Sequence, residues 1–245
     1  MSTSGTIQRV AQASPRLKAR LAGIFYLISG EAFSFAEFSV CGKLTVQGDA
    51  AATARNILAH QTLYRMGFAA ELIETILFIA VAVLLYDLFK PVSRTVSLLA
   101  AFLSLTGSII YAMGSLLHLA PILLLGGTPY LSAFTPNQLQ ALALAALTLR
   151  AQSNSLYMVF FGSYNLLLGY LIFRSKFMPR ILGVFMALAG LTYLAYLWPP
   201  LATRFFPYVL APAGALGELS LMLWLIVFGV NPQRWKEQAA AAGES

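Results

Sequence analysis

The chain has 245 residues, of which 59% are hydrophobic and only 10% are charged. Soluble domains carry about 25% charged residues, so this composition excludes an ordinary soluble domain as well as disordered and collagen-like chains. The single cysteine, Cys41, cannot form an internal disulfide. The formal net charge of +7 arises from basic residues in short clusters beside apolar runs, as in membrane proteins, and we expect no nucleic-acid partner.

The apolar residues form six runs, each close to the length of about 20 residues that a transmembrane helix needs. The first run, 21–41, is longer than the apolar region of a secretory signal, which has about 7 to 15 residues, so we expect an uncleaved helix. It follows a tail, 1–20, that contains four basic residues and no acidic residue. The expected spans are 21–41, 64–88, 92–117, 156–173, 181–197 and 208–230, and residues 231–245 form a C-terminal tail.

Two of the connections contain helical segments of their own. Asp49 is placed to cap a helix that begins at Ala50 and leads toward the second span. In the longest connection, Thr135-Pro136 predicts the start of a helix over 136–150. We expect that helix to lie on the outer membrane interface, and the alternative is a continuous, kinked extension of the fourth span. The predicted fold is therefore an all-α polytopic membrane protein, with one domain over 21–230, six transmembrane helices and an extra outer interfacial helix.

The distribution of basic residues predicts the orientation. With both termini in the cytoplasm, eleven of the sixteen Lys and Arg residues lie on the cytoplasmic side. Because cytoplasmic loops of membrane proteins carry an excess of Lys and Arg, we expect this orientation, with connections 42–61 and 118–153 outside. The five basic residues that remain outside are Lys43, Arg55, Arg65, Arg150 and Arg204.

Several strings in the sequence resemble a known family. They are ARLAGIFYLI at 19–28, GDAAATA at 48–54, FGSYNLLLGYLI at 161–172, PRILGV at 179–184 and GVNPQRW at 229–235. They are similar to the bacterial membrane-protein family catalogued as domain of unknown function 4386. The resemblance covers nearly the whole chain and is most specific over 161–193. It implies a bacterial multi-pass inner-membrane protein of one domain, and it brings no reaction, substrate or site residue.

Acidic residues inside the predicted spans indicate a binding site. A charged side chain at bilayer depth costs about 2.5 to 3.5 kcal/mol on insertion scales, so such residues normally face a bundle interior or a cavity. Glu31, Glu74 and Glu218 fall near the middle of three different spans, and Glu71 shares a helix face with Glu74. No Lys or Arg lies near that depth. At least one of these carboxyl groups is therefore expected to be protonated or to bind a cation.

Neutral polar groups on the other spans lie at a corresponding depth. They either line a cavity with the acidic residues or join helices through hydrogen bonds. Nearer the outer surface, we expect Glu37 to form an ion pair with Arg65. The predicted site for a ligand or a proton comprises Glu31, Glu71, Glu74, Glu218, Tyr111, Tyr164, Asn165 and Tyr193.

The histidines give only a weak indication of metal chemistry. His60 and His118 lie on the outer side and could form a metal or hydrolytic site with Glu37. The sequence has no HExxH, CxxC or GxSxG pattern, and we expect no metal site and no cofactor. The leading prediction is a binding or transport-like protein, surrounded by membrane lipids, whose central acidic cavity accepts a cation, a proton or a small amphipathic ligand. A lipid-acting intramembrane enzyme and a structural or sensory subunit are the alternatives, and a non-enzyme is favoured.

Overall fold

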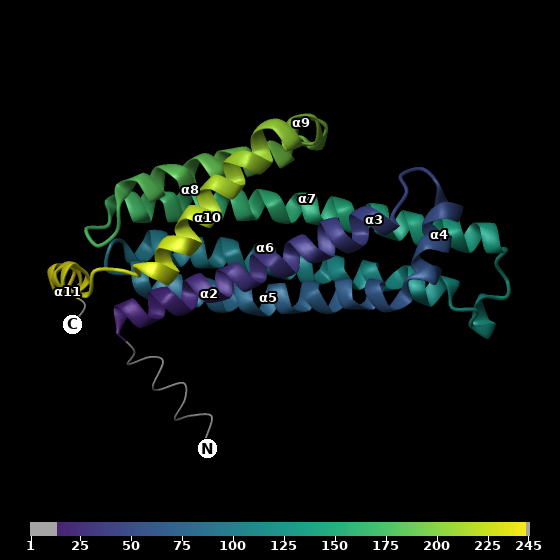
Figure 1. Ribbon diagram of the computed structural model, residues 1–245, viewed down its shortest axis with the longest axis horizontal. Helices are drawn as coiled ribbons and strands as arrows, with labels where there is room; N and C mark the ends of the chain where they lie inside the picture. Colours follow the sequence, from purple (N-terminus) through teal and green to yellow (C-terminus); the bar gives the residue numbers. More distant parts are fainter. Residues whose placement is uncertain (1–13, 244–245) are drawn as a thin grey trace, which may run out of the picture. The chain divides into compact units, whose positions relative to one another are not determined.

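The computed structural model describes residues 14–243, and the regular elements in this range are all helices (Figure 1). Arg9 of the predicted N-terminal tail lies outside the described residues. The helices in chain order are α2 (Pro15–Ser34), η1 (Phe35–Cys41), α3 (Gly42–Leu44), α4 (Ala50–Ala59), α5 (Gln61–Phe89), α6 (Arg94–Leu125), η2 (Pro129–Leu131), α7 (Pro136–Arg174), α8 (Arg180–Tyr193), η3 (Leu194–Leu197), α9 (Pro199–Phe205), η4 (Phe206–Leu210), α10 (Ala211–Val227) and α11 (Pro232–Ala241).

Five helical stretches in the described part of the chain are long and apolar enough to cross a membrane. The number becomes six if the pair α10 and α11 counts as one span, although these helices are bent by 103°. Gly229, with φ +66, lies in the break, and the Asn231 side chain accepts hydrogen bonds from the first turn of α11. The all-α class with five or six such helices confirms the predicted fold class and indicates a membrane protein.

Residues 136–150 form part of a continuous helix, as in the alternative prediction. The prediction of a separate interfacial helix is therefore wrong. Residues 136–150 form the first part of α7, which continues to Arg174 over 39 residues. The physical reason is local, because no proline or glycine occurs between Pro136 and Gly162 and Leu and Ala dominate the first turns. Arg150 therefore lies inside a long helix, and not at the end of a short one.

The third span is also longer than predicted. Helix α6 passes through Pro121 and ends at Leu125, whereas the sequence predicted an end near residue 117. A proline inside a helix removes one backbone donor, but the apolar residues on both sides continue the helix. The helix ends before Gly127, which has φ +71. His118 consequently lies within α6, with a helical turn on either side of it.

The segment before the second span confirms the predicted cap. The Asp49 carboxylate accepts a hydrogen bond of 2.8 Å from the Ala52 amide and caps α4. Helix α4 stops at Ala59, because His60 adopts φ −126 and ψ 40, and α5 begins at Gln61.

The chain divides into two compact units. The described part of unit 1 comprises 14–27, Phe78–Gly107 and 158–243, and unit 2 comprises Ile28–Leu77 and Ser108–Tyr157. In unit 1, Gly169 of α7 and Gly183 of α8 bring two backbones into contact, since a Cβ atom on Gly183 would lie 2.6 Å from the Gly169 carbonyl oxygen. Small residues at such positions are typical of packed transmembrane helices. The core of unit 2 contains Val40, Leu44, Ile57, Tyr64 and Leu147.

Candidate functional site

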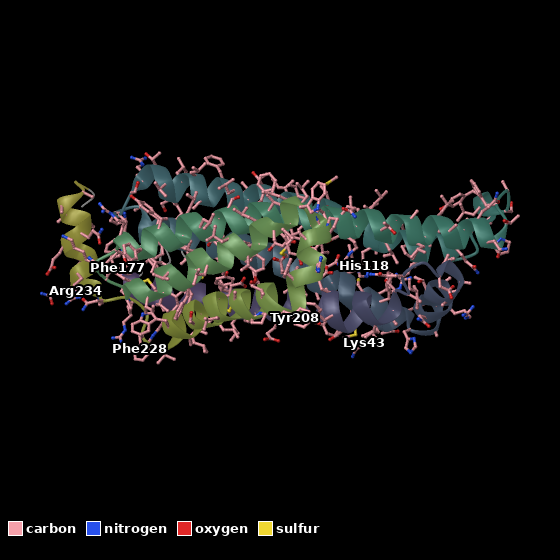
Figure 2. The ribbon with its side chains drawn as sticks, turned by 90° about the horizontal axis from the view of Figure 1, so that it is seen from above. Lys43, His118, Phe177, Tyr208, Phe228 and Arg234 are labelled. Carbon is pink, nitrogen blue, oxygen red and sulfur yellow. The ribbon has the colours of Figure 1, made fainter. Side chains whose placement is uncertain are left out.

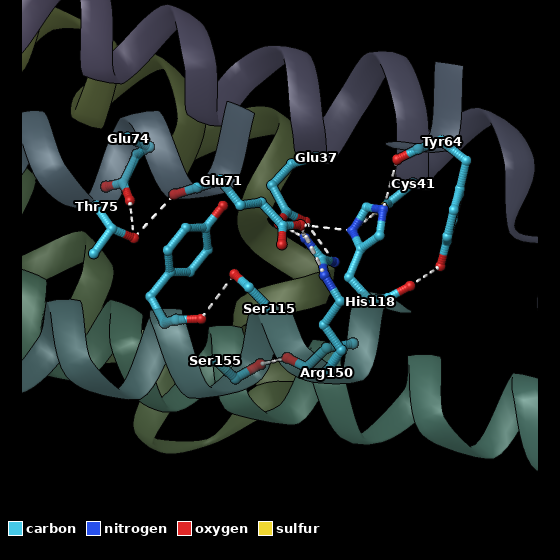
Figure 3. Close-up of polar contacts among 12 residues, drawn as sticks. Glu37, Cys41, Tyr64, Glu71, Glu74, Thr75, Ser115, His118, Arg150 and Ser155 are labelled. Atoms are coloured by element: carbon cyan, nitrogen blue, oxygen red, sulfur yellow. Dashed lines mark hydrogen bonds and ion pairs between the residues drawn. The ribbon is translucent and has the colours of Figure 1, made fainter. Parts of the chain in front are cut away.

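A cluster of buried charged side chains lies in unit 2, and four helical segments contribute to it (Figure 3). Glu37 comes from η1, Glu71 from α5, His118 from α6 and Arg150 from α7, and we call these four residues the ion cluster. The side chains of Glu71 and His118 are 0% exposed, and those of Arg150 and Glu37 are 7% and 15% exposed. Such burial is unusual for charged side chains unless they are paired.

Arg150 joins the two carboxylates of the ion cluster. Its Nε atom donates to Glu71 Oε1 at 3.0 Å, and its Nη1 atom donates to Glu37 Oε2 at 3.5 Å. Its Nη2 atom forms an ion pair with each of the same two carboxylates. One guanidinium group therefore serves two buried carboxylates and neutralises only one of their two negative charges.

His118 has an acceptor at each ring nitrogen. Nε2 lies 3.0 Å from the backbone carbonyl oxygen of Tyr64, and Nδ1 lies 2.8 Å from Glu71 Oε1. A carbonyl oxygen can only accept, so Nε2 carries the N–H group, and Nδ1 of a neutral imidazole then holds a lone pair. That lone pair faces a carboxylate oxygen, which is also an acceptor. A positive species, either a proton or a metal ion, is needed between these two atoms.

Cys41 completes a group of three side chains around this point. Its Sγ atom lies 3.7 Å from His118 Nδ1. Cys41, Glu71 and His118 are all buried, and each offers one potential ligand atom within 4.8 Å of the other two. These three residues are therefore able to hold a metal ion.

The π-helix η1 positions two of the side chains near this point. Glu37 and Cys41 belong to η1, which runs over Phe35–Cys41 between two α-helical segments. Single π-helical turns inside α-helices are frequent at functional sites. Here the turn supplies both a carboxylate and a thiol to the centre of unit 2.

Glu74 lies one helical turn from Glu71 and has neutral partners. The Tyr157 hydroxyl donates to its Oε1 atom at 3.3 Å, and the Thr75 hydroxyl lies 3.3 Å from Oε2. The Tyr111 ring packs 5.0 Å from that of Tyr157. The Tyr111 hydroxyl and Glu71 Oε2 are buried and have no hydrogen-bond partner within residues 14–243. This part of unit 2 therefore has polar atoms that remain free to bind a ligand.

The predicted ion pair between Glu37 and Arg65 is wrong, because Glu37 pairs with Arg150. Arg65 is exposed on α5. The prediction assigned Arg150 to an interfacial helix, whereas the continuous α7 brings it into the core of unit 2. A signal for Arg150 was present in the sequence, since it is the single Lys or Arg in the long apolar stretch 137–173.

The predicted binding residues fall into both units. Glu31, which is exposed, belongs to unit 2 with Glu71, Glu74 and Tyr111. The other four belong to unit 1, where the Tyr193 hydroxyl donates to Glu218 Oε1 at 2.5 Å. The predicted convergence of Glu31, Glu74 and Glu218 joins residues of different units and stays a prediction. In unit 1, the side-chain polar atoms that are buried without a partner in the described chain include those of Tyr164 and Asn165.

Comparison with known proteins identifies a family. A family model described as "Domain of unknown function (DUF4386)" matches residues 21–229. This range contains the whole ion cluster and Cys41. No curated protein matches the chain, and no solved structure does so.

Proposed function

The chain belongs to this family of domain of unknown function 4386, and we propose that it is a binding or transport-like protein of the bacterial inner membrane whose ion cluster binds a small cation. The observation that carries the proposal is the facing pair of acceptors at Glu71 Oε1 and His118 Nδ1, which lie 2.8 Å apart. A bound cation satisfies both atoms at once. The predicted acidic site is thereby narrowed to the part of unit 2 around Glu71.

The charges of the ion cluster support this proposal. With a neutral imidazole, Glu37, Glu71 and Arg150 leave one net negative charge among side chains that are nearly inaccessible to solvent. A buried charge without compensation is strongly destabilising. A cation at this position supplies the missing charge, and the free Oε2 atom of Glu71 offers it a further ligand.

A basic pocket in unit 1 supports the proposal that the end of unit 1 around Arg174 and Arg234 faces the cytoplasm. It has a volume of about 830 Å³, and its lining includes Arg174, Lys176, Arg180 and Arg234. Figure 2 shows Phe177 and Arg234 at the same end of unit 1, where the Asn231 amide donates to the Phe177 carbonyl oxygen at 3.3 Å. Basic pockets between helices on the cytoplasmic side bind anionic lipid head groups, so we include membrane lipids among the partners.

The orientation can be tested with a single introduced cysteine. Ser132 is exposed in the connection before α7. We expect Ser132→Cys, made in a Cys41→Ser background, to react in intact cells or spheroplasts with a thiol reagent that cannot cross the membrane. Arg180→Cys in the same background is the matched control and should react only after the membrane is disrupted. The opposite pattern of labelling would contradict the proposed orientation.

Cation binding can be tested on the purified protein in detergent. We expect isothermal titration with chloride salts of Na⁺, Mg²⁺, Zn²⁺ and tetramethylammonium to show about one site for at least one of these ions. Glu71→Gln removes a charge at the centre of the site and should weaken that binding at least tenfold, about the smallest effect reported for residues around metal sites. Glu237→Gln is the matched control, because Glu237 is exposed on α11 and does not belong to the ion cluster, and its affinity should equal that of the wild type. Equal affinities for the wild type and Glu71→Gln would refute the proposal, as would the absence of binding by all four ions.

A further inference from the structure

We infer that the cation is a divalent metal ion of the zinc class, bound by Cys41 Sγ, the Glu71 carboxylate and His118 Nδ1. The inference rests on the proposed function and names the ligand of that site. The three ligand atoms come from η1, α5 and α6, which are distant in sequence, and they lie within 4.8 Å of one another. This metal site would replace the sequence-based expectation that the protein has no metal site.

The distances between the ligand atoms suit tetrahedral coordination. Bond lengths of about 2.0 to 2.1 Å to nitrogen and oxygen and about 2.3 Å to sulfur imply separations of about 3.6 Å between sulfur and nitrogen and about 3.3 Å between nitrogen and oxygen. The observed separations are 3.7 Å from Cys41 Sγ to His118 Nδ1 and 2.8 Å from that nitrogen to Glu71 Oε1. An outward movement of the Glu71 carboxylate by about half an ångström therefore makes room for the ion.

The hydrogen bonds of His118 prepare Nδ1 to bind a metal. Histidines that bind metals usually donate the other ring N–H to a carbonyl or carboxylate oxygen, which fixes the tautomer and the ring orientation. His118 Nε2 faces the Tyr64 carbonyl oxygen at 3.0 Å. The Tyr64 hydroxyl in turn donates to the His118 carbonyl oxygen at 2.7 Å. Tyr64 thus holds His118 through two hydrogen bonds. In the resulting orientation, His118 Nδ1 faces Glu71 and Cys41.

The same arrangement does not support a cysteine nucleophile. A Cys-His-Glu relay uses both ring nitrogens, one to accept the nucleophile's proton and the other to contact the carboxylate. In unit 2, Cys41 and Glu71 both face Nδ1, and Nε2 is occupied by a backbone carbonyl group. The three side chains converge on one point, as ligands of an ion do.

The charges balance when a divalent ion is bound. Coordination deprotonates the Cys41 thiol, and its proton passes to water. The ion then adds two positive charges and the thiolate one negative charge, so the net charge of the ion cluster and Cys41 changes from −1 to zero. Glu71 Oε1 is then shared between the ion and Arg150.

The donor atoms determine the class of ion. A thiolate and an imidazole favour zinc and similar borderline ions, whereas Mg²⁺ and Ca²⁺ prefer sites made of oxygen atoms. Three protein ligands leave the fourth tetrahedral position to water or to a further ligand. The inference therefore predicts one Zn²⁺ or Co²⁺ per chain and no comparable affinity for Mg²⁺.

Cobalt gives a direct test, because the sequence contains a single cysteine. We expect Co²⁺ added to chelator-treated, purified protein to give the near-ultraviolet charge-transfer band of a thiolate ligand and the intense visible bands of tetrahedral Co²⁺. The band must come from Cys41. Zn²⁺ should abolish both spectra at one equivalent. Cys41→Ser should lose the charge-transfer band and bind Zn²⁺ more than about 100-fold more weakly, since even residues around the ligands contribute 10- to 100-fold.

A second pair of variants separates this inference from the proposed function. His60→Gln changes the other histidine, whose Nδ1 atom lies 3.0 Å from the Asn56 carbonyl oxygen at the exposed end of α4. This variant should leave the cobalt spectrum intact. His118→Gln should abolish the spectrum. If folded wild-type protein gives no charge-transfer band and does not retain Zn²⁺, the metal site is wrong. If Na⁺ or tetramethylammonium then still binds in a manner that depends on Glu71 but not on Cys41, the proposed cation-binding function survives without the metal.

Discussion

Replacement of Arg150 by methionine is expected to lower the free energy of unfolding by about 3 to 5 kcal/mol, the range for breaking one side of a buried ion pair. Arg150 is the common partner of Glu37 and Glu71, and its side chain is only 7% exposed. Methionine fills a similar length of apolar space but leaves two buried carboxylates without their guanidinium group. Unfolding followed by circular dichroism in a mild detergent, with increasing denaturant, gives the measurement.

Two further variants test the cause of this loss. Arg65→Met removes an exposed arginine and should change stability by less than about 0.5 kcal/mol. The triple variant Arg150→Met, Glu37→Gln, Glu71→Gln removes all three charges together and should recover much of the lost stability, because replacing a complete buried ionic group is often close to neutral. Equal stability of Arg150→Met and Arg65→Met would show that the ion cluster does not hold unit 2 together.

Local patterns in the sequence predicted the apolar membrane-spanning helices. A transmembrane segment must satisfy its backbone hydrogen bonds internally, so apolar runs of about 20 residues translate directly into helices. Asp49 also acts as the cap that its position indicated, since its side chain accepts from the Ala52 amide, whereas helix α11 lies in the segment that was predicted as a tail. These features depend on a few neighbouring residues and need no knowledge of tertiary contacts.

The predicted partner of Glu37 was wrong because the prediction placed a helix boundary after residue 150. With a predicted break near residue 153, Arg150 was expected at the membrane surface. Arg65, at a depth similar to that of Glu37, was then the expected partner of Glu37. The two halves of α7 form one helix, so Arg150 reaches the core of unit 2. The better signal was the isolation of Arg150 in an apolar stretch, because a lone buried arginine requires a carboxylate partner.

The grouping of Cys41, Glu71 and His118 could not be read from spacing. Metal motifs such as HExxH place two ligands on one helix, whereas these three residues come from three segments far apart in the chain. The π-helical geometry of η1 and the continuation of α6 beyond residue 117 were not predicted either. The sequence indicated a weak candidate site of His118, Glu37 and His60, but His60 is exposed and lies at the end of α4.

Zn²⁺ is expected to stabilise Arg150→Met more than it stabilises the wild-type protein. In the wild type, an ion present at 100 times its dissociation constant adds about 2.7 kcal/mol to the free energy of unfolding. The bound ion and Arg150 share the Glu71 carboxylate. Without Arg150 this competition disappears, and the ion supplies the positive charge that both carboxylates lack. Its affinity should therefore be higher in the variant, and the stability gained at the same Zn²⁺ concentration should be larger.

The measurement compares unfolding with Zn²⁺ and with a chelator in four proteins: wild type, Arg150→Met, Cys41→Ser and the double variant. Cys41→Ser removes the thiolate but no charge from the unliganded ion cluster, so it should abolish the Zn²⁺ effect while leaving the loss caused by Arg150→Met in place. A gain that is equal in wild type and Arg150→Met would mean that the ion binds away from Glu71. A gain that persists in the double variant would remove Cys41 from the site, because nothing else in the chain can supply a thiolate.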